Sequence, residues 1–289
     1  METGNVGLVL QGPAGIGKTA LWRAGLEQVQ RYGARVIPAT PSHAEQQLSY
    51  SGLRDLVRGI LDHDSEAFSR LAPHVERAVL SAVRIAPPTE LPIDALTVAA
   101  GVRHAFVVLA AVGPVVIAID DIQWLDDASA TVLTHVLRRS LGATSLLATR
   151  RTEGHDVVNV HLPDWVECLP IVQLERDAIL DLVASRWEQC QGTPMAAKIA
   201  DLCAGNPFVA TELVRVNLRA DLTGPPEVPA HLTAGHTDRI RRSSRRRYRR
   251  NRRTGRRGPD QCRTRRLASG RNLGRCIARE ESARTRRAE

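Results

Sequence analysis

The stretch GPAGIGKT, residues 12–19, decides how this chain folds. It fits the pattern G-x-x-x-x-G-K-[ST] through Gly12, Gly17, Lys18 and Thr19. Glycines let the backbone adopt a positive φ and approach an anion closely. Successive N–H groups of such a loop converge on the anion, and a following helix adds the positive end of its dipole. We therefore expect a phosphate-binding loop here.

The sequence on both sides of this stretch has the structure that the pattern requires. Residues 6–10, VGLVL, are typical of a short buried strand, and residues 19–29 carry apolar side chains at helical spacing. The order of strand, glycine loop and helix disfavours the alternative, a glycine-rich surface turn.

A loop of this kind implies a nucleoside triphosphate and Mg²⁺. We expect Lys18 to reach the β- and γ-phosphates as a point charge and the Thr19 hydroxyl to bind Mg²⁺. The chain has 38 arginines but only two lysines, Lys18 and Lys198. A lysine at position 18 of an arginine-rich chain indicates a place that a compact ammonium fits and a planar guanidinium does not. The expected nucleotide contacts in this region are Gly12, Pro13, Gly15, Gly17, Lys18, Thr19 and Ala20.

A second part of the site is predicted in VVIAIDD, residues 115–121, an apolar run that ends in two carboxylates. A continuous apolar run is typical of a central parallel strand covered on both faces. Asp120 at its end is placed to hold Mg²⁺, directly or through water. Asp121 is then placed to orient or deprotonate the attacking water. The alternative is a strand that ends in an ordinary acidic turn.

An arginine is a candidate for the γ-phosphate. Arg150 and Arg151 follow the apolar strand predicted at residues 145–149. The carboxyl ends of strands line the crevice of an open α/β sheet, so one arginine can face the phosphate. A solvated arginine pair in a loop is the alternative, and we favour Arg150 for the catalytic role.

The remaining pattern predicts an α/β fold in which helices flank a parallel sheet, as in P-loop NTPases. We expect a core over residues 1–167, a small helical lid over 168–240, where helices alone follow, and a basic tail over 241–289. The core is expected to have strands at 35–39, 115–119 and 145–149 and helices at 45–61, 66–85, 94–112 and 128–139, the last capped by Asp127. The lid is expected to have helices at 175–186, from Thr193 to about Gly205, and from Asn206 to about Arg219.

The cysteines, the N-terminal residues and the longest apolar run indicate the cellular compartment and whether the chain crosses a membrane. The five cysteines are odd in number and include no C-x-x-C, which argues against disulfides or zinc and favours the cytoplasm. No signal peptide is visible in METGNVG, residues 1–7. The longest apolar run, residues 105–119, is too short for a membrane span and is split by a Gly-Pro pair. We expect no membrane partner.

The stretch DDIQWLDDAS, residues 120–129, resembles the D-D-x-Q-W-x-D-x-x-S stretch of STAND-type AAA ATPases. It is similar in particular to the N-terminal ATPase modules of large LuxR-family transcriptional regulators from actinobacteria. LLATRR, residues 146–151, resembles the sensor strand of that family, with Arg150 at the sensor arginine. GNPFVATEL, residues 205–213, resembles its G-x-P motif and implies that Pro207 lies near the base and ribose.

This resemblance covers residues 5–240 and implies a signalling switch that binds ATP or ADP and hydrolyses ATP slowly. A protein partner or self-association on activation is expected with it. Family members usually carry a segment before the first strand that packs on the adenine, and a C-terminal DNA-binding region. This chain begins five residues before Val6, which leaves its base selectivity and affinity open. The sequence shows no such C-terminal region, so we expect a truncated regulator.

The tail is open to three interpretations. Residues 241–289 hold 20 arginines against four acidic residues, a net charge of +16, whereas residues 1–240 have a net charge of −7. The tail is a basic arm for DNA or RNA, a solvated disordered appendage, or out-of-frame translation of a GC-rich gene. We favour the third, because the family-like pattern collapses at Ser243. A nucleic-acid-associated AAA ATPase is the alternative function, and a small-molecule phosphotransferase ranks last.

Overall fold

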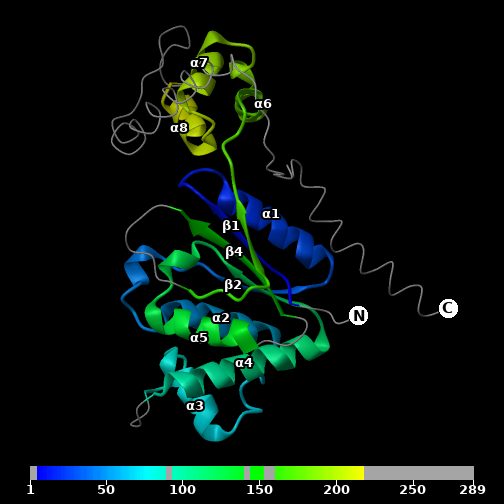
Figure 1. Cartoon of the computed structure of the whole chain (residues 1–289), viewed down its shortest axis with the longest axis vertical. Coiled ribbons are helices and arrows are strands. Elements are labelled where there is room, and N and C mark those ends of the chain that lie inside the picture. Colours follow the sequence, from blue (N-terminus) through cyan, green and yellow to red (C-terminus); the bar gives the residue numbers. More distant parts are fainter. Residues whose placement is uncertain (1–4, 89–92, 140–143, 153–159, 218–289) are drawn as a thin grey trace, which may run out of the picture. The chain divides into compact units, whose positions relative to one another are not determined.

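A five-stranded parallel sheet forms the centre of the first of two units (Figure 1). The computed structural model describes residues 5–88, 93–139, 144–152 and 160–217. The first unit extends to Ile171 and the second begins at Val172, and each is described by itself. The strands are β1 (Gly7–Gly12), β2 (Arg35–Ala39), β3 (Val115–Ile119), β4 (Thr144–Arg151) and β5 (Val166–Pro170). Their order is β2-β3-β4-β1-β5, which confirms the predicted α/β class.

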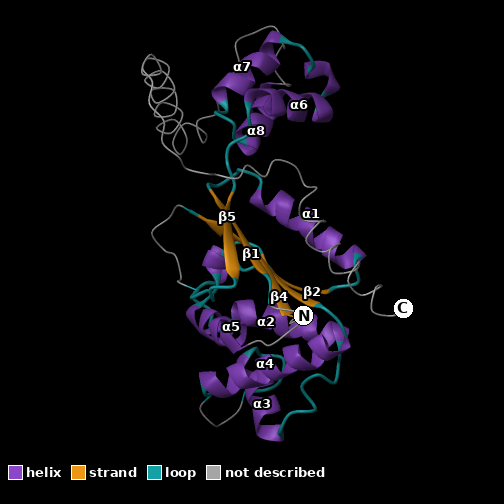
Figure 2. Cartoon of the chain, turned by 45° about the vertical axis from the view of Figure 1, so that its right-hand side comes forward, coloured by secondary structure: helices purple, strands orange, loops and turns teal. Residues whose placement is uncertain are grey.

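Helices cover both faces of this sheet (Figure 2). One face carries α1, and the other carries α2, α4 and α5, with α3 packed on α4. The helices are α1 (Lys18–Arg31), α2 (Ser51–His63), α3 (Pro73–Ala82), α4 (Ala95–Val112) and α5 (Asp127–Arg139), with short turns η1 (His43–Glu45) and η2 (Ile122–Trp124). Because β3 lies between two helical layers, all five of its residues are buried.

Alternation along the strands divides the core into two parts. Ile117 and Ile119 of β3 belong to the cluster on the side of α2, α4 and α5. Val116 and Ala118 belong to a smaller cluster that includes Trp22 of α1. The Trp22 indole also donates a hydrogen bond to the Leu147 carbonyl of β4, at 3.0 Å. This contact fixes α1, and with it the glycine loop, over the middle of the sheet.

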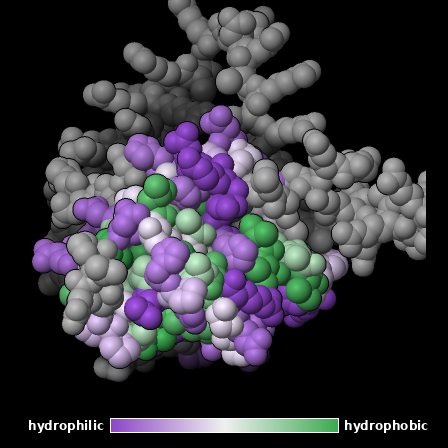
Figure 3. All heavy atoms as spheres, turned by 90° about the horizontal axis from the view of Figure 1, so that it is seen from below, coloured by the Kyte–Doolittle hydropathy of each residue, from purple (hydrophilic) through white to green (hydrophobic). Residues whose placement is uncertain are grey.

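Helix α4 is strongly apolar, and its buried side chains form part of the core. By length and composition alone, this helix is long and apolar enough to cross a membrane, with a mean hydropathy of 1.9. The helix, with 18 residues, is longer than the apolar run at residues 105–119 that was considered in the sequence. Its buried side chains, among them Val98, Val102 and Phe106, pack in the main core cluster. Figure 3, which views the molecule from below, shows apolar side chains interspersed with hydrophilic ones.

The structure differs from the sequence prediction in several elements. Strand β5 was not predicted, and it spans the expected boundary at 167 and 168. Its side chains are partly exposed because it is an edge strand paired only with β1 among the described strands, so its apolar signal is weak. The helix expected over 66–85 is restricted to α3, and the helix expected over 45–61 is divided between η1 and α2.

The part of the second unit that the structure describes, up to residue 217, contains three α-helices with a core of their own. They are α6 (Arg176–Arg186), α7 (Pro194–Leu202) and α8 (Pro207–Asn217), with η3 (Glu188–Cys190) between the first two. Thr193 caps α7 by accepting the Ala196 amide, and Asn206 caps α8 by accepting the amides of Phe208 and Val209. These caps confirm the predicted helix starts. The expected tail, residues 241–289, and the helix end near Arg219 lie outside the described residues.

Asp126, rather than Asp127, is the capping residue of α5. The Oδ1 atom of Asp126 accepts the Ser129 amide at 2.9 Å, and Asp127 is the exposed first residue of the helix. The same carboxylate also accepts the amides of Tyr50 at 2.7 Å and Gly52 at 3.2 Å, at the start of α2. One buried side chain therefore caps two helices that are far apart in sequence.

We expect Asp126→Ala to lower the free energy of unfolding by about 3 kcal/mol, because it leaves buried amides of two helices without acceptors. Urea denaturation followed by circular dichroism measures this change. Asp127→Ala is the matched control, and we expect it to stay within about 0.5 kcal/mol of wild type. Equal effects of the two substitutions would contradict the assignment of the cap.

Candidate functional site

The glycine loop between β1 and α1 has the backbone that a phosphate requires. Gly15 has a φ of 75° and Gly17 a φ of 102°, in the region that other residues rarely adopt. Gly17 is the N-cap residue of α1, so the loop leads directly into the helix. The first N–H groups of a helix have no partner within it, and they point outward with the positive end of the dipole. This end of α1 can therefore receive an anion.

Lys18 lies against the loop that precedes it. Its side chain is 6% exposed, and its Nζ donates to the carbonyls of Gly12 at 3.0 Å and Pro13 at 2.9 Å. Burial lowers the pKa of Lys18 below the usual lysine value, Asp121 and Asp120 raise it, and the nearby Arg151 lowers it. The ammonium is thus held at the loop, near two carboxylates and one guanidinium.

Thr19 and Asp120, 101 residues apart in sequence, meet at the carboxyl edge of the sheet. The Thr19 hydroxyl donates to Asp120 Oδ1 at 3.2 Å. The same oxygen accepts the hydroxyl of Thr149 at 2.6 Å. Strand β4 lies between β1 and β3, so a short polar side chain at its end can connect the two predicted parts of the site. The structure therefore places Thr19 and Asp120 within hydrogen-bonding distance, as the two sequence motifs predicted.

Asp121 has a different environment from Asp120. Its backbone is left-handed, with a φ of 54°, and its amide donates to the Thr149 hydroxyl at 2.7 Å. Its carboxylate accepts Gln123 Nε2 at 2.8 Å and both Nε and Nη2 of Arg151, each at 3.2 Å. A water-activating role for Asp121 remains a prediction, and in this arrangement three donors already occupy the carboxylate.

Gln123 and Trp124 hold Arg151 in this position. The Gln123 side chain is 2% exposed, and its Oε1 accepts the Arg151 amide at 3.0 Å. The Arg151 guanidinium lies 5.7 Å from the centroid of the Trp124 ring, which in turn makes an edge contact with His43. The turn after β3 therefore fixes the side chain at the end of β4.

Arg150 lies on the other face of β4 from Thr149. Alternation along the strand places Arg150 with Leu146 and Ala148, which belong to the core cluster on the side of α2, α4 and α5. The Nε atom of Arg150 is buried and has no hydrogen-bond partner. The structure thus pairs Arg151 rather than Arg150 with Asp121, and the γ-phosphate role of Arg150 remains a prediction.

Two further predicted contacts make no hydrogen bond to this cluster among those described. Ala20 is exposed on the first turn of α1. Pro207 is the first residue of α8 in the second unit, which is described by itself, so its place near the base stays a prediction.

The oxygen atoms of Thr19 and Asp120 fit Mg²⁺. Mg²⁺ prefers oxygen ligands, keeps several waters, and is bound by one or two protein groups together with phosphates. Within the described part of the chain, no group of three or more His, Cys, Asp or Glu residues could form an all-protein metal site. A hydroxyl and a carboxylate beside a phosphate loop are therefore the donor set that a nucleotide-borne Mg²⁺ would use.

One residue of this site was not predicted from the sequence, and another was the less favoured of two candidates. Thr149 is fully buried and contacts both aspartates, and Arg151 was the less favoured member of its pair. A threonine that ends an apolar strand next to charged residues was the available signal for Thr149. The partner of Arg151 could not be found without the register of β4 beside β3.

A family model described as an AAA ATPase domain matches residues 2–151, slightly more than half of the chain. No curated protein matches the chain.

Solved structures are similar to the chain at low identity. They include the Aeropyrum pernix Orc1 protein in complex with DNA, with 20% identity, a TM-score of 0.47 and coverage of 83% of this chain and 60% of that chain. A Pyrococcus horikoshii STAND protein with a tetratricopeptide repeat sensor has 15% identity, a TM-score of 0.40 and coverage of 83% and 30%. The Drosophila ORC bound to DNA has 17% identity, a TM-score of 0.41 and coverage of 76% and 53%. The chain spans less than two thirds of each.

The pKa of Lys18 provides a test of the charges around the loop. We expect Arg151→Met to raise this pKa, because it removes a positive charge, and Asp121→Asn to lower it, because it removes a negative charge. NMR titration of the lysine side chains measures both shifts. Since the chain has only two lysines, Lys198→Arg assigns the signals. Shifts in the opposite directions would contradict this placement of the charges.

Proposed function

The chain belongs to the AAA ATPase domain family, and from this premise we propose that it is a switch that binds Mg·ATP and hydrolyses it slowly. The observation that carries the proposal is the hydrogen bond between the Thr19 hydroxyl and Asp120, directly after the glycine loop. A hydroxyl and a carboxylate joined at the end of an anion-binding helix form a place for a metal that accompanies a phosphate.

In this proposal the chain binds the triphosphate through the loop that follows β1. The amides of Gly15, Gly17 and Thr19 surround the phosphates. An ammonium has three donors, and two of those on Lys18 already bond to loop carbonyls, so the third is the one we expect on a phosphate oxygen. The carbonyls therefore position Lys18 for binding.

Slow hydrolysis follows from the contacts of Asp121. Gln123 and both ends of the Arg151 fork take three of the four acceptor positions of this carboxylate and leave one on Oδ2 for a water molecule. The contact with Arg151 therefore restricts how water can approach Asp121. We infer that Arg151 limits turnover, and Arg150 remains the candidate for the γ-phosphate.

We further propose that the chain is a fragment of a LuxR-type transcriptional regulator. The residues of DDIQWLDDAS that carry this resemblance all make defined contacts in the first unit, as far as it is described. In such a switch, nucleotide state biases the helical second unit, with Pro207 near the base, and a protein partner or a second copy reads the change. The cytoplasm is the compartment that we propose.

A nucleic-acid-associated ATPase is the second candidate. The observation that favours it is the net charge of +16 over residues 241–289, a charge that attracts phosphate backbones. This interpretation requires that DNA stimulate ATP hydrolysis and that deletion of 241–289 remove the stimulation. Family-like helical sequence in another frame of the coding DNA beyond codon 242 would instead support the truncated regulator.

Binding of Mg·ATP by wild type and by Lys18→Ala tests the primary function. We expect the substitution to weaken binding by at least about tenfold, because hydrogen bonds to a charged group contribute about 1.5–3 kcal/mol. Titration calorimetry with and without Mg²⁺ measures the affinity. Lys198→Ala, the only other lysine, is the matched control and should bind as wild type does. Equal affinity of the Lys18 variant and wild type would reject the site.

The two aspartates should separate metal binding from turnover. We expect Asp120→Ala to remove the dependence of ATP affinity on Mg²⁺, because it deletes the carboxylate beside Thr19. Asp121→Asn should retain Mg·ATP binding but slow hydrolysis by about a hundredfold or more, because a general base is lost. Phosphate release under single-turnover conditions measures the rate. Equal Mg²⁺ dependence in the two variants would contradict these roles.

A further inference from the structure

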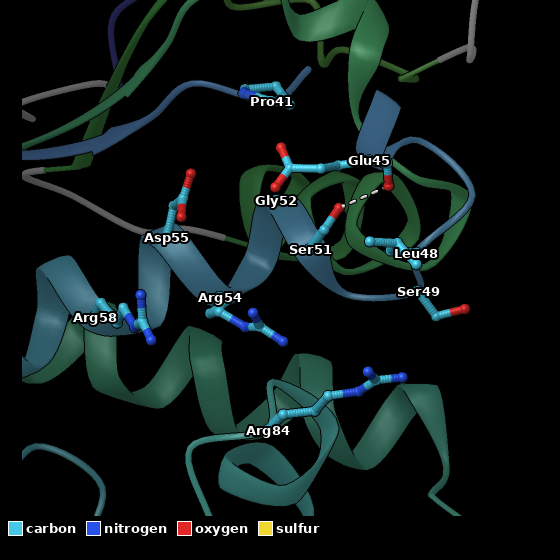
Figure 4. A pocket seen from close by; sticks show the side chains of 10 residues that line it. All are labelled: Pro41, Glu45, Leu48, Ser49, Ser51, Gly52, Arg54, Asp55, Arg58 and Arg84. Atoms are coloured by element: carbon cyan, nitrogen blue, oxygen red, sulfur yellow. Dashed lines mark hydrogen bonds between the residues drawn. The ribbon is translucent and has the colours of Figure 1, made fainter. Parts of the chain in front are cut away.

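A second polar hollow lies beyond the carboxyl end of β2 (Figure 4). Its volume is about 220 Å³, and none of the phosphate-loop residues lines it. Three arginines lie on its wall, Arg54 and Arg58 from α2 and Arg84 from the segment after α3. Residues 54 and 58 are four apart and share one face of the helix. The hollow is therefore separate from the nucleotide site and is rich in guanidinium groups.

In the described part of the chain, these three arginines form no salt bridges. None of the four salt bridges found there involves Arg54, Arg58 or Arg84. The Nε atom of Arg54 donates to the Val83 carbonyl at 2.9 Å, which fixes the plane of its guanidinium. Figure 4 shows Arg54 and Arg84 extending in the same direction, towards the side of the hollow where Ser49 lies. Two guanidinium groups that line one hollow favour an anion in it.

The backbone at Arg84 is strained. Its φ is 55°, in the left-handed region, directly after α3, where glycine is the usual residue. The amides of Ile85 and Ala86 both donate to the Leu80 carbonyl, which closes the turn around this residue. This turn places the Arg84 side chain on the wall of the hollow.

Two carboxylates also line the hollow, on the other side of α2 from Arg54 and Arg84 (Figure 4), and they restrict the type of anion. Glu45 accepts the Ser42 hydroxyl at 2.7 Å, and Asp55 accepts the Thr40 amide at 3.4 Å. Burial raises the pKa of Asp55. Carboxyl groups that line the same hollow disfavour a ligand that is anionic throughout, such as a polyphosphate. They favour a ligand that joins an anionic group to a hydroxyl or an amine.

We propose that this hollow binds a small phosphate monoester that carries a hydroxyl or amino group. Planar guanidinium forks match the geometry of a phosphate, and Arg54 and Arg84 would hold it in pairs of hydrogen bonds. Asp55 and Glu45 would accept hydrogen bonds from the other end of the molecule. A hollow of about 220 Å³ is smaller than a pocket for a drug-sized ligand, which favours a small occupant. The site goes beyond the proposed nucleotide switch and does not depend on it.

The test uses the full chain carrying Lys18→Ala, so that the glycine loop does not compete for phosphate. The probe is O-phosphoethanolamine, titrated by calorimetry against ethanolamine at equal ionic strength. We expect saturable binding of the phosphate ester and no binding of ethanolamine. No binding of the ester, or equal binding of the two, would overturn the proposal.

Arg84→Gly in the same background separates binding from folding. We expect it to weaken binding of O-phosphoethanolamine at least tenfold and to raise the melting temperature, because glycine relieves the left-handed strain. Arg77→Ala, on the exposed surface of α3, is the matched control and should retain binding. Unchanged affinity of the Arg84 variant would overturn the assignment. Tighter binding of a single-stranded DNA 20-mer, lost in Arg84→Gly, would assign the hollow to nucleic acid and overturn it as well.

Discussion

The Asp120 carboxylate is the contact on which the first unit depends. One of its oxygens accepts the hydroxyls of Thr19 and Thr149, which lie at the ends of different elements. These three residues meet only because β4 lies between β1 and β3 in a parallel sheet, so that the carboxyl ends of all three strands reach one edge. The order of the strands, and not closeness in sequence, therefore creates the site.

The stretch after β3 combines two tasks that are usually separate. Its first half, Asp120 to Trp124, places charged groups beside the glycine loop and beside Arg151. Its second half secures α2: Asp126 caps that helix, and the Ser129 hydroxyl accepts the Leu53 amide at 2.8 Å. A single short turn thus sets both the chemistry of the site and the packing of the helices beneath it. We infer that this double task explains why so many of its residues are polar although several are buried.

Local signals predicted the central part of the fold better than its edges. The strands over 35–39 and 115–119 were placed correctly, because each is an apolar run bounded by a change of composition. Edge strand β5 was missed, since its partly exposed side chains carry little apolar signal. Thr19 and Asp120 could be named from motifs, whereas the pairing of Arg151 with Asp121 depends on the register of two strands and the position of Gln123. Such pairings depend on tertiary structure and leave no mark in local sequence.

The contacts of Lys18 and Asp121 indicate how the proposed switch differs from an efficient catalyst. Lys18 is positioned by two carbonyls and is ready to bind phosphate without rearrangement. Asp121 accepts three donors, which leave one acceptor position on its Oδ2 atom for water. The fold therefore positions Lys18 for binding, whereas an ion pair and two hydrogen bonds on the Asp121 carboxylate oppose the chemical step. We infer that a partner able to move Arg151 or Trp124 would change the rate of hydrolysis, because these side chains contact Asp121 or its partner.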